Sequence, residues 1–414
     1  MKDLAVSLPD VERAAAAIRG AIVRSPTVAA PALSQLAGAE IFLKLETQHL
    51  TGSFKERGAL VKLLSLGAAA RKRGVVAMSA GNHAQGVAYH AARLGIPATI
   101  VMPQGTPFTK IDRTEAYGAT VVLEGTTLSA ASAAADQFAR DKGVAFVHPY
   151  DDAAVIAGQG TIGLELVEDC RDLDTVVVPI GGGGLISGIA TAVKARAPRI
   201  EVVGVQAALY PSMYRLMRGE DAGSPSDAPT LAEGIAVKEP GKLTRQIIKA
   251  LVSDIRLVDE AAIEGAVEAF IERQKLVVEG AGAAGLAAVL GAPERFRGRR
   301  VAIVVTGGNI DSRLLASVLM RGLVRDGRLV RLRAELPDIP GALSRISGVI
   351  GGHGANIVEV HHQRLFDDTS VKRAELDIVV ETQNRRHVEA LIAALVAAGF
   401  PTRLLSSNGE TDHE

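Results

Sequence analysis

The chain has 414 residues, of which 48% are hydrophobic and 3% aromatic, and its 46 basic residues balance its 46 acidic ones. This length suggests roughly two or three domains, and the apolar fraction is sufficient for a large buried core. The lack of net charge and the scarcity of aromatic residues argue against nucleic-acid binding, because neither electrostatic attraction nor a stacking surface is available.

The single cysteine, Cys170, excludes a disulfide framework and a cysteine-rich zinc site. Such low cysteine use is typical of a reducing compartment. The N-terminal stretch contains Asp3 and Asp10 and lacks the apolar core of a secretory signal. No apolar run reaches the ~18 residues that a membrane span needs. We therefore expect a soluble cytoplasmic protein with no membrane partner.

Short β-rich runs alternate with alanine-rich helical stretches as far as about residue 325. The 43 glycines gather between these runs, as in enzymes whose tight loops hold a ligand at strand ends. Nearly continuous Val and Ile in the strands predict an α/β fold, with a parallel sheet covered on both faces. The expected strands are 41–45, 75–78, 98–102, 120–123, 175–180, 201–205 and 300–306, and expected helices include 82–94, 127–142 and 185–196.

The pattern changes after about residue 325, where an arginine-rich stretch runs from Arg321 to Arg333. We interpret this stretch as a solvated junction between domains, since a nucleic-acid-binding segment would carry aromatic residues. Beyond it the predicted order is β-α-β-β-α-β, the ferredoxin-like arrangement. We place strands at 329–335, 357–364, 372–380 and 402–405, helices at 342–352 and 384–398, and a disordered tail at 406–414.

Residues 181–184 are four consecutive glycines between the expected strand 175–180 and a helix. Their backbone N–H groups can converge on one anion with the helix dipole behind them, which favours a phosphate cradle over an ordinary flexible loop. No Lys-Ser/Thr pair follows, so the loop is not a P-loop. A dinucleotide fingerprint would need a glycine at Ile186 and an acidic residue at Gln206, so we expect a monophosphate cofactor.

Lys55 stands at the start of a predicted helix, in the run GSFKERGA (52–59). The positive end of the helix dipole disfavours its ammonium form, and a neutral lysine can form a Schiff base with an aldehyde. The neighbouring Phe54 could lie flat against an aromatic cofactor ring. Taken alone this pattern is weak, because a lysine at a helix start is more often a solvated surface charge.

Two further motifs directly follow expected strands. SAGNH (79–83) places hydroxyl, amide and backbone N–H groups at a helix start, which suits a carboxylate or phenolate oxygen but also an ordinary helix cap. TGGN (306–309) places a hydroxyl at the carboxyl end of a strand, either facing a ligand crevice or forming a tight turn.

Together these motifs resemble one family in order and spacing: the fold-type-II pyridoxal-phosphate enzymes, and most of all their threonine/serine dehydratase branch. The resemblance implies a tryptophan-synthase-β-like catalytic domain at 1–325, with two lobes built on open parallel sheets. The motifs are KLETQHLTGSFKERGA (44–59), SAGNHAQGVA (79–88), GGGGLISG (181–188), VVEGAGAAG (277–285) and TGGN (306–309).

The resemblance also implies the chemistry. Pyridoxal 5'-phosphate would be the cofactor, and Lys55 would be the Schiff-base lysine that also takes the substrate's α-proton. The reaction would be β-elimination from L-threonine, and from L-serine, to 2-oxobutanoate or pyruvate and ammonia. The implied cofactor contacts are Phe54, Lys55, Asn82, Gly181, Gly182, Gly183, Gly184, Leu185 and Thr306, and the implied substrate contacts are Ser79, Gly81, Asn82 and His83.

Two residues depart from the family pattern, and two alternative functions stay open. Thr306 stands where many dehydratases have serine, and Glu233 where aspartate is common; neither changes the reaction class. One alternative is a racemase on the same fold, which needs an acid or base opposite Lys55; serine racemases have a serine at the place of Ala80. The other is a catalytically inactive amino-acid-binding regulator, which would be expected to have lost Lys55 or the glycine loop.

Other polar residues give weaker signals. Glu279 either supports the site or caps the helix that follows it. His361 and His362 resemble a metal pair, but neighbours on a strand point to opposite faces and cannot chelate together. His148 and His353 stand alone, so we expect no transition-metal site.

The turn DIPGAL (338–343), followed by GANI (354–357), resembles the ACT domain, an amino-acid-sensing module. We place this domain at 326–405. ACT modules usually pair, so the resemblance implies a homodimer or homotetramer and an amino-acid effector, isoleucine first, in isoleucine biosynthesis or threonine catabolism. The effector contacts would be Gly341, Ala342, Leu343 and Asn356.

Overall fold

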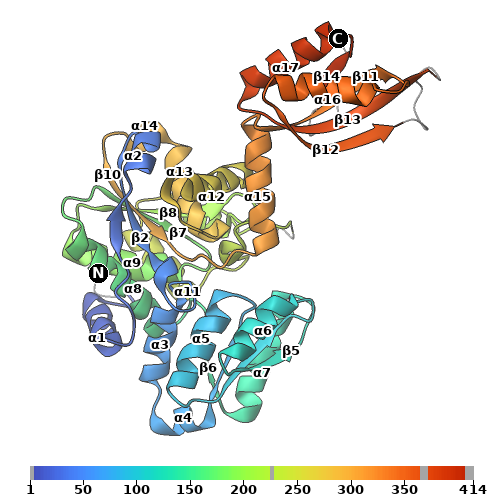
Figure 1. Cartoon of the computed structure of the whole chain (residues 1–414). Helices are drawn as coiled ribbons and strands as arrows, with labels where there is room; N and C mark the ends of the chain where they lie inside the picture. Colours follow the sequence, from blue (N-terminus) through green and yellow to red (C-terminus); the bar gives the residue numbers. More distant parts are fainter. Residues whose placement is uncertain (1–3, 224–227, 364–371, 406–414) are drawn as a thin grey trace. The chain divides into compact units, whose positions relative to one another are not determined.

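The computed structural model describes residues 4–223, 228–363 and 372–405. The chain forms two compact units, one ending at Ile310 and the other beginning at Asp311. Figure 1 labels the helices and strands of both units and colours them along the sequence. Within the described residues, no helix is both long and apolar enough to cross a bilayer.

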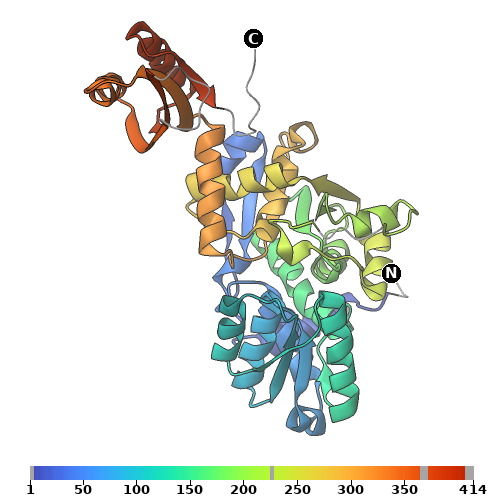
Figure 2. The ribbon, with the colours of Figure 1, turned by 90° about the vertical axis from the view of Figure 1, so that its right-hand side faces the viewer.

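The first unit has two lobes, and Figure 2 shows the smaller one at the bottom, in blue to teal. The sheet of the larger lobe has six strands, in the order β1 (Thr27–Ala29), β2 (Glu40–Leu45), β10 (Arg300–Val305), β7 (Thr175–Pro179), β8 (Glu201–Ala207) and β9 (Asp254–Val258). Four of its strand pairs are parallel: β2–β10, β10–β7, β7–β8 and β8–β9. β1 pairs antiparallel with β2, so the expectation of a parallel sheet is wrong at this edge.

The helices of the first unit cover its sheets and supply their crossovers, as parallel strands require. They are α1 (Leu8–Ile18), α2 (Pro31–Ala37), η1 (Glu46–Gln48), α3 (Lys55–Ser65), α4 (Ala68–Arg73), α5 (Asn82–Arg93), α6 (Phe108–Ala116), α7 (Leu128–Lys142), α8 (Ala153–Asp169), α9 (Gly184–Arg196), α10 (Ser212–Met217), η2 (Glu233–Ile235), α11 (Lys242–Leu251), α12 (Glu260–Gln274), α13 (Gly280–Leu290) and α14 (Pro293–Phe296).

Strand β7 shows why the central strands are apolar throughout. Val176 and Val178 belong to the core cluster formed with α8 and α9. Val177, between them, faces the opposite side, where α13 packs so closely that a Cβ at Gly285 would lie 3.7 Å from its side chain. Because alternate side chains of a strand point to opposite faces, helices on both faces require an uninterrupted apolar strand.

The smaller lobe has four parallel strands in the order β5 (Thr120–Leu123), β4 (Ala98–Met102), β3 (Val75–Met78) and β6 (Ala145–Phe146). The strands expected at 75–78, 98–102 and 120–123 have these bounds. The short strand β6 was not expected, nor were β1 and β9. The other expected strands of this unit differ from the observed ones by one or two residues.

The second unit begins with helix α15 (Ser312–Arg325), and the β-α-β-β-α-β order follows as expected. Helices α16 (Ala342–Gly352) and α17 (Arg385–Ala397) pack on one face of an antiparallel sheet (Figure 1). The sheet order is β12 (Asn356–Gln363), β13 (Arg373–Glu381), β11 (Leu329–Pro337) and β14 (Thr402–Leu405). The tail expected at 406–414 lies outside the described residues.

The arginine-rich stretch is not simply a solvated junction. Arg331 and Arg333 lie on β11, and both bind Asp377 of β13, whose side chain is only 1% exposed. The Nη2 of Arg331 and the Nε of Arg333 each lie 2.6 Å from a carboxylate oxygen of Asp377. These two residues belong to a sheet, where a cross-strand carboxylate neutralises them, while the side chain of Arg331 stays 52% exposed.

Candidate active site

The motifs at the strand ends meet in the first unit. Ser79 follows β3, Gly181 follows β7 after one residue, and Thr306 follows β10 directly. Gly181 and Thr306 lie at the same edge of the six-stranded sheet, where the carboxyl ends of its parallel strands meet. Ser79 belongs to the four-stranded sheet, and its turn reaches the residues after β10 through Asn82, whose Oδ1 accepts from Asn309. Lys55 reaches the same place because the segment before α3 pairs with the residues after β10.

This pairing fixes Lys55 relative to Thr306. The N–H of Phe54 donates to the carbonyl of Thr306 at 3.1 Å, and the N–H of Gly308 donates to the carbonyl of Gly52 at 3.0 Å. The two segments therefore form a short antiparallel ladder. The catalytic candidate and the hydroxyl-bearing residue belong to one rigid block.

Lys55 is the first residue of α3, and its Nζ donates to the carbonyl of Pro149 at 2.8 Å. No carboxylate of the described part of the chain forms an ion pair with it. Burial lowers the pKa of Lys55 to about 8, while the charge of Glu279 acts in the opposite direction. A partly neutral amine near physiological pH is a nucleophile and a base. Phe54 lies beside it, with the Lys55 Nζ 5.2 Å from the ring centroid.

A buried ionic cluster at the first turn of α3 was not predicted from the sequence. The guanidinium of Arg57 lies 2.7 and 3.0 Å from the two carboxylate oxygens of Glu46, and 2.6 and 2.9 Å from those of Glu165. Lys44 also binds Glu165, at 2.6 Å, and both cations are almost fully buried. Burial opposes ionisation of Glu46, but Arg57 and His49 outweigh it and hold its pKa below the usual range.

The cluster joins the turn between β2 and α3 to helix α8. The sequence offered a signal, since charged residues interrupt an otherwise apolar strand end. Their pairing could not be read from it, because Glu165 is more than a hundred residues away in the chain. The cluster therefore anchors the N-terminal turn of α3, which begins at Lys55.

Contacts from outside the glycine loop fix its backbone at the start of α9. Gly183 has φ +96°, which glycine adopts without strain, and α9 begins at the next residue. The carbonyl of Gly182 is held from outside by Thr244 Oγ1, at 2.7 Å, and by the N–H of Gly241. A Cβ at Gly182 would lie 2.3 Å from the ring of Tyr150. The first-turn N–H groups of α9 have no acceptor within the helix and suit a phosphate.

The SAGNH run forms the turn into α5. Ser79 Oγ accepts the N–H of Gly81 at 3.1 Å, which leaves the hydroxyl proton available to a ligand. The imidazole of His83 is buried and bonds the carbonyl of Val147 at 2.9 Å. Burial lowers the pKa of His83 to about 3, so the ring is neutral. The ring of His83 is therefore not suited to bind a carboxylate, but its backbone N–H, at the start of α5, is.

Glu279 supports the site and does not cap its helix. It stands at the N-cap of α13, but its side chain makes no capping bond. Its Oε1 accepts from Asn82 Nδ2 at 2.8 Å instead. Burial raises the pKa of Glu279 to about 7, against hydrogen bonds from Asn82 and the backbone of Asn309 that favour the carboxylate. Asn309, which the sequence analysis named only within TGGN, donates to Asn82 Oδ1 at 2.8 Å.

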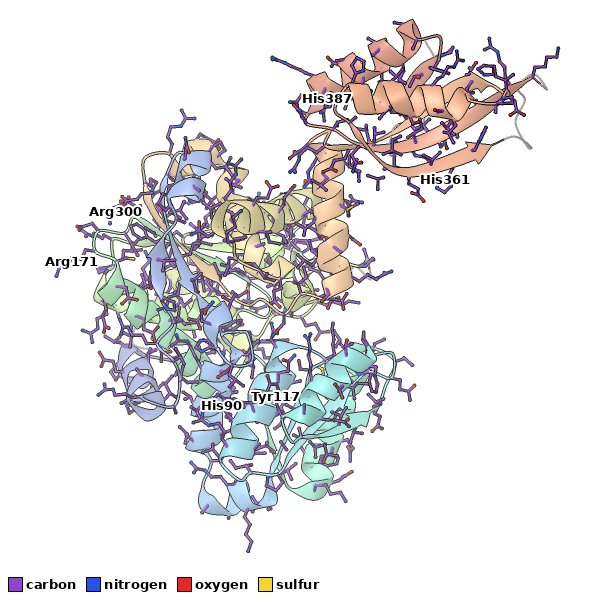
Figure 3. The ribbon with its side chains drawn as sticks, viewed as in Figure 1. His90, Tyr117, Arg171, Arg300, His361 and His387 are labelled. Carbon is purple, nitrogen blue, oxygen red and sulfur yellow. The ribbon has the colours of Figure 1, made fainter. Side chains whose placement is uncertain are left out.

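The histidines that the sequence analysis considered as metal ligands have other partners. His361 pairs with Glu359 at 2.8 Å and projects from β12 in Figure 3. His148 Nδ1 accepts the N–H groups of Tyr150 and Asp151. Nδ1 of His353 lies 2.9 Å from the Val349 carbonyl oxygen. Within the described residues, no group of three or more His, Cys, Asp or Glu could hold a metal ion.

A pocket of about 300 Å³ lies in the second unit. Gly341, Ala342 and Leu343 line it at the start of α16, and His362 of β12 faces it. Asn356 does not line it but pairs with Glu381 at the far end of β12. Three of the four expected effector contacts are therefore together, while His362 was not expected among them.

Comparison with known proteins gives two family matches. Residues 18–307 match the family model for pyridoxal-phosphate dependent enzymes, and residues 330–400 match that for the ACT domain. An L-threonine ammonia-lyase from Thermotoga maritima is 44% identical over 400 residues, which cover 97% of this chain and 100% of that protein.

Solved structures agree in fold. A maize serine racemase has a TM-score of 0.72 at 32% identity, covering 78% of this chain and 99% of the other. Threonine deaminase isoform 2 of Solanum lycopersicum has a TM-score of 0.71 at 33% identity, covering 75% of this chain and 93% of the other. The chain belongs to the fold-type-II pyridoxal-phosphate dependent enzymes, in the L-threonine ammonia-lyase family with a C-terminal ACT domain.

Proposed function

We propose that this chain is a pyridoxal-phosphate-dependent lyase that converts L-threonine, and also L-serine, to the 2-oxo acid and ammonia. The observation that carries the proposal is that Lys55 bonds the carbonyl of Pro149 while the glycine loop packs against the next residue, Tyr150, in a chain 44% identical to an L-threonine ammonia-lyase over nearly its whole length.

The residues present fit the cofactor. Thr244 fixes the backbone of the glycine loop through a hydrogen bond to the Gly182 carbonyl. The loop N–H groups, with that of Leu185 in the first turn of α9, are suited to the phosphate. Lys55 offers an amine whose pKa is lowered by burial, as attack on the cofactor aldehyde requires. Thr306, only 3% exposed, supplies a hydroxyl for the pyridine nitrogen. Phe54 would flank the ring, and Asn82 would donate to the 3-oxygen.

Pyridoxal phosphate, when bound, supplies an electron-withdrawing ring that acidifies the substrate's α-proton. Lys55 takes that proton, and its lowered pKa keeps a usable fraction of the amine neutral near pH 7. The hydroxyl of Ser79 and the first-turn N–H groups of α5 bind the substrate carboxylate and orient its α-carbon toward Lys55. Thr306 is uncharged, so it does not hold the pyridine nitrogen protonated, which favours prompt loss of the β-hydroxyl.

The same fold carries racemases, so the fold alone does not decide the reaction. Racemisation needs a proton donor on the substrate face opposite Lys55. Ala80 lies in the turn between Ser79 and α5 and has no proton to give. Elimination is therefore favoured over racemisation, and a chiral assay for D-serine formed from L-serine tests this distinction.

We further propose that residues 1–325 act as the catalytic domain and residues 326–405 as an amino-acid-sensing domain. The pocket lined by Gly341, Ala342 and Leu343 supports an effector site. ACT modules usually pair, so a homodimer or homotetramer is expected in solution. A chain with one buried cysteine suits a reducing cytoplasm.

The decisive experiment measures 2-oxo acid formation from L-threonine and L-serine, with and without isoleucine. We expect turnover of both substrates, and a rate dependence on threonine that shifts when isoleucine is present. Absence of 2-oxo acid from both substrates, in protein that has bound the cofactor, would refute the proposed reaction.

A further inference from the structure

The side-chain amide of Asn82 is bonded at both ends. Its Oδ1 accepts from Asn309 Nδ2 at 2.8 Å, and its Nδ2 donates to Glu279 Oε1 at 2.8 Å. An amide nitrogen carries two protons, so one N–H of Asn82 remains for another acceptor. Among the described residues no further bond of this nitrogen is formed.

The orientation of Asn309 is itself set by a group that can only accept. Its Nδ2 donates to the carbonyl of Thr51 at 2.7 Å as well as to Asn82. If the amide of Asn309 were reversed, its oxygen would face two other oxygens, and two hydrogen bonds would become repulsive contacts. A backbone carbonyl therefore determines which end of Asn309, and in turn which end of Asn82, faces which neighbour.

Glu279 binds the nitrogen end of the Asn82 amide, and Asn309 also acts on Glu279. The backbone N–H of Asn309 also favours the ionised form of Glu279, which lowers the pKa of that carboxyl against the effect of burial. Gly307 leaves the space that this carboxylate occupies, since a Cβ there would lie 2.7 Å from Glu279 Oε1. Asn309 thus holds one partner of Asn82 through its backbone and Asn82 itself through its side chain.

We infer that Asn309 is a positioning residue, which fixes the Asn82 amide so that an N–H, and not the oxygen, faces the cofactor's 3-oxygen. This inference rests on the proposed function for the contact between Asn82 and the cofactor. A reversed Asn82 would turn its oxygen toward the ionised carboxylate of Glu279 and toward the 3-oxygen, and both of these are acceptors.

The test begins with Asn309→Asp, which has the same shape but replaces both donated hydrogen bonds by an acceptor. Asn82 then turns its nitrogen toward residue 309 and its oxygen toward the cofactor. Titration of the apoprotein with pyridoxal 5'-phosphate should give a Kd about tenfold to a hundredfold higher. The absorption band of the bound cofactor should shift, and its pH dependence should shift with it, because the 3-oxygen loses a donor.

The double variant Asn309→Asp/Glu279→Gln separates orientation from stability. It restores the net charge, and the amide introduced at position 279 can donate to the reversed oxygen of Asn82. The melting temperature of the apoprotein should therefore recover, at least in part, relative to Asn309→Asp. The cofactor Kd and absorption band should not recover, because Asn82 is now held in the reversed orientation. Recovery of both would show that Asn309 serves only stability and would overturn the inference.

Two further variants keep the test decisive. Asn309→Ala adds no charge, so it removes the orientation signal even if the aspartate variant folds poorly; its cofactor Kd should rise, but less than in Asn309→Asp. Asn384→Asp is the matched control, since Asn384 caps α17 through Oδ1 and a carboxylate caps equally well. Its cofactor Kd and absorption should match those of the wild type.

These outcomes are separate from those of the proposed function. If the wild type binds the cofactor but makes no 2-oxo acid, the reaction is refuted while the binding test still decides the role of Asn309. If the wild type turns over threonine and Asn309→Asp and Asn309→Ala bind the cofactor as the wild type does, the inference alone is wrong.

Discussion

The Nζ of Lys55 donates to the backbone carbonyl of Pro149 at 2.8 Å. A carbonyl stabilises the ammonium less than a carboxylate would, so burial dominates and the pKa of Lys55 falls to about 8. The amine is thereby oriented by a hydrogen bond but not locked in its charged form. Both properties are needed by a residue that must first bind an aldehyde and then move a proton.

Lys55→Ala should abolish cofactor attachment and lower kcat by at least about a thousandfold. The purified variant should lack the near-visible absorption of the lysine-bound cofactor. Lys62→Ala is the matched control in the same helix, since Lys62 only pairs with Asp152. Its absorption and turnover should remain, and near-normal turnover by Lys55→Ala would refute the assigned role.

The rate at which the apoprotein captures pyridoxal phosphate should depend on pH. The neutral amine is the nucleophile, and the pKa of Lys55 is lowered to about 8. Below that value the rate should fall about tenfold per pH unit, and above it the rate should level off. Stopped-flow absorption measures this profile. A profile still rising steeply near pH 10 would show an ordinary, solvated lysine.

Thr306→Ser should keep kcat within a few-fold, since the hydroxyl partner of the pyridine nitrogen is retained. Thr306→Asp should lower kcat by about tenfold or more, because a carboxylate holds that nitrogen protonated and stabilises charge in the ring. Steady-state kinetics and a spectrum recorded with threonine present test this pair. An aspartate variant with an unchanged rate and no new long-wavelength band would contradict the assignment.

Arg57→Ala should destabilise the protein by about 3–5 kcal/mol, because it removes the cation that both Glu46 and Glu165 bind in a buried cluster and leaves them only His49 and Lys44 as partners. Denaturant unfolding of the apoprotein measures the change. Arg199→Ala is the control: Arg199 binds Asp172 at 2.7 Å, but both side chains are more than 70% exposed. Its cost should stay below about 1 kcal/mol, and equal costs for the two variants would contradict the importance of the cluster.

Removal of the chain after Arg325 should leave threonine turnover but abolish the response to isoleucine. An effector changes activity only through its different affinities for two arrangements of the protein, and the truncated chain lacks the pocket at Gly341. Rate against threonine concentration, with and without isoleucine, decides the matter. A truncated enzyme that responds like the full chain would place the sensor elsewhere.

Much of the fold could be predicted because its signals are local. An apolar run such as 98–102, followed by a helical pattern, identifies a buried parallel strand, and the order of elements identified the ferredoxin-like unit. β9 was not predicted, because its sequence DIRLV, at a sheet edge, alternates charged and apolar residues and lacks the continuous apolar run of a buried strand. The antiparallel pairing of β1 escaped because three residues carry too little pattern to predict a partner.

The candidate site also has parts that the local sequence predicts and parts that it does not. Lys55 and the glycine loop lie in motifs that predict their own local geometry. The contacts of Glu279 and Asn309 with Asn82 join residues that are about two hundred positions apart in the chain. The imidazole of His83 bonds the carbonyl of Val147, and this could not be predicted, because a histidine motif does not specify which way the ring points.

The place of β10 in the larger sheet has a consequence for synthesis on the ribosome. β10 lies between β2 and β7, so those two strands, made much earlier, cannot join into one sheet until residues 300–305 have been translated. The smaller lobe is one continuous stretch and can form its sheet from contacts already made. Lys55 therefore emerges long before Thr306, the residue whose carbonyl anchors its loop. The cofactor site is the last part of the catalytic unit to assemble, so a nascent chain binds pyridoxal phosphate only when that unit is nearly complete.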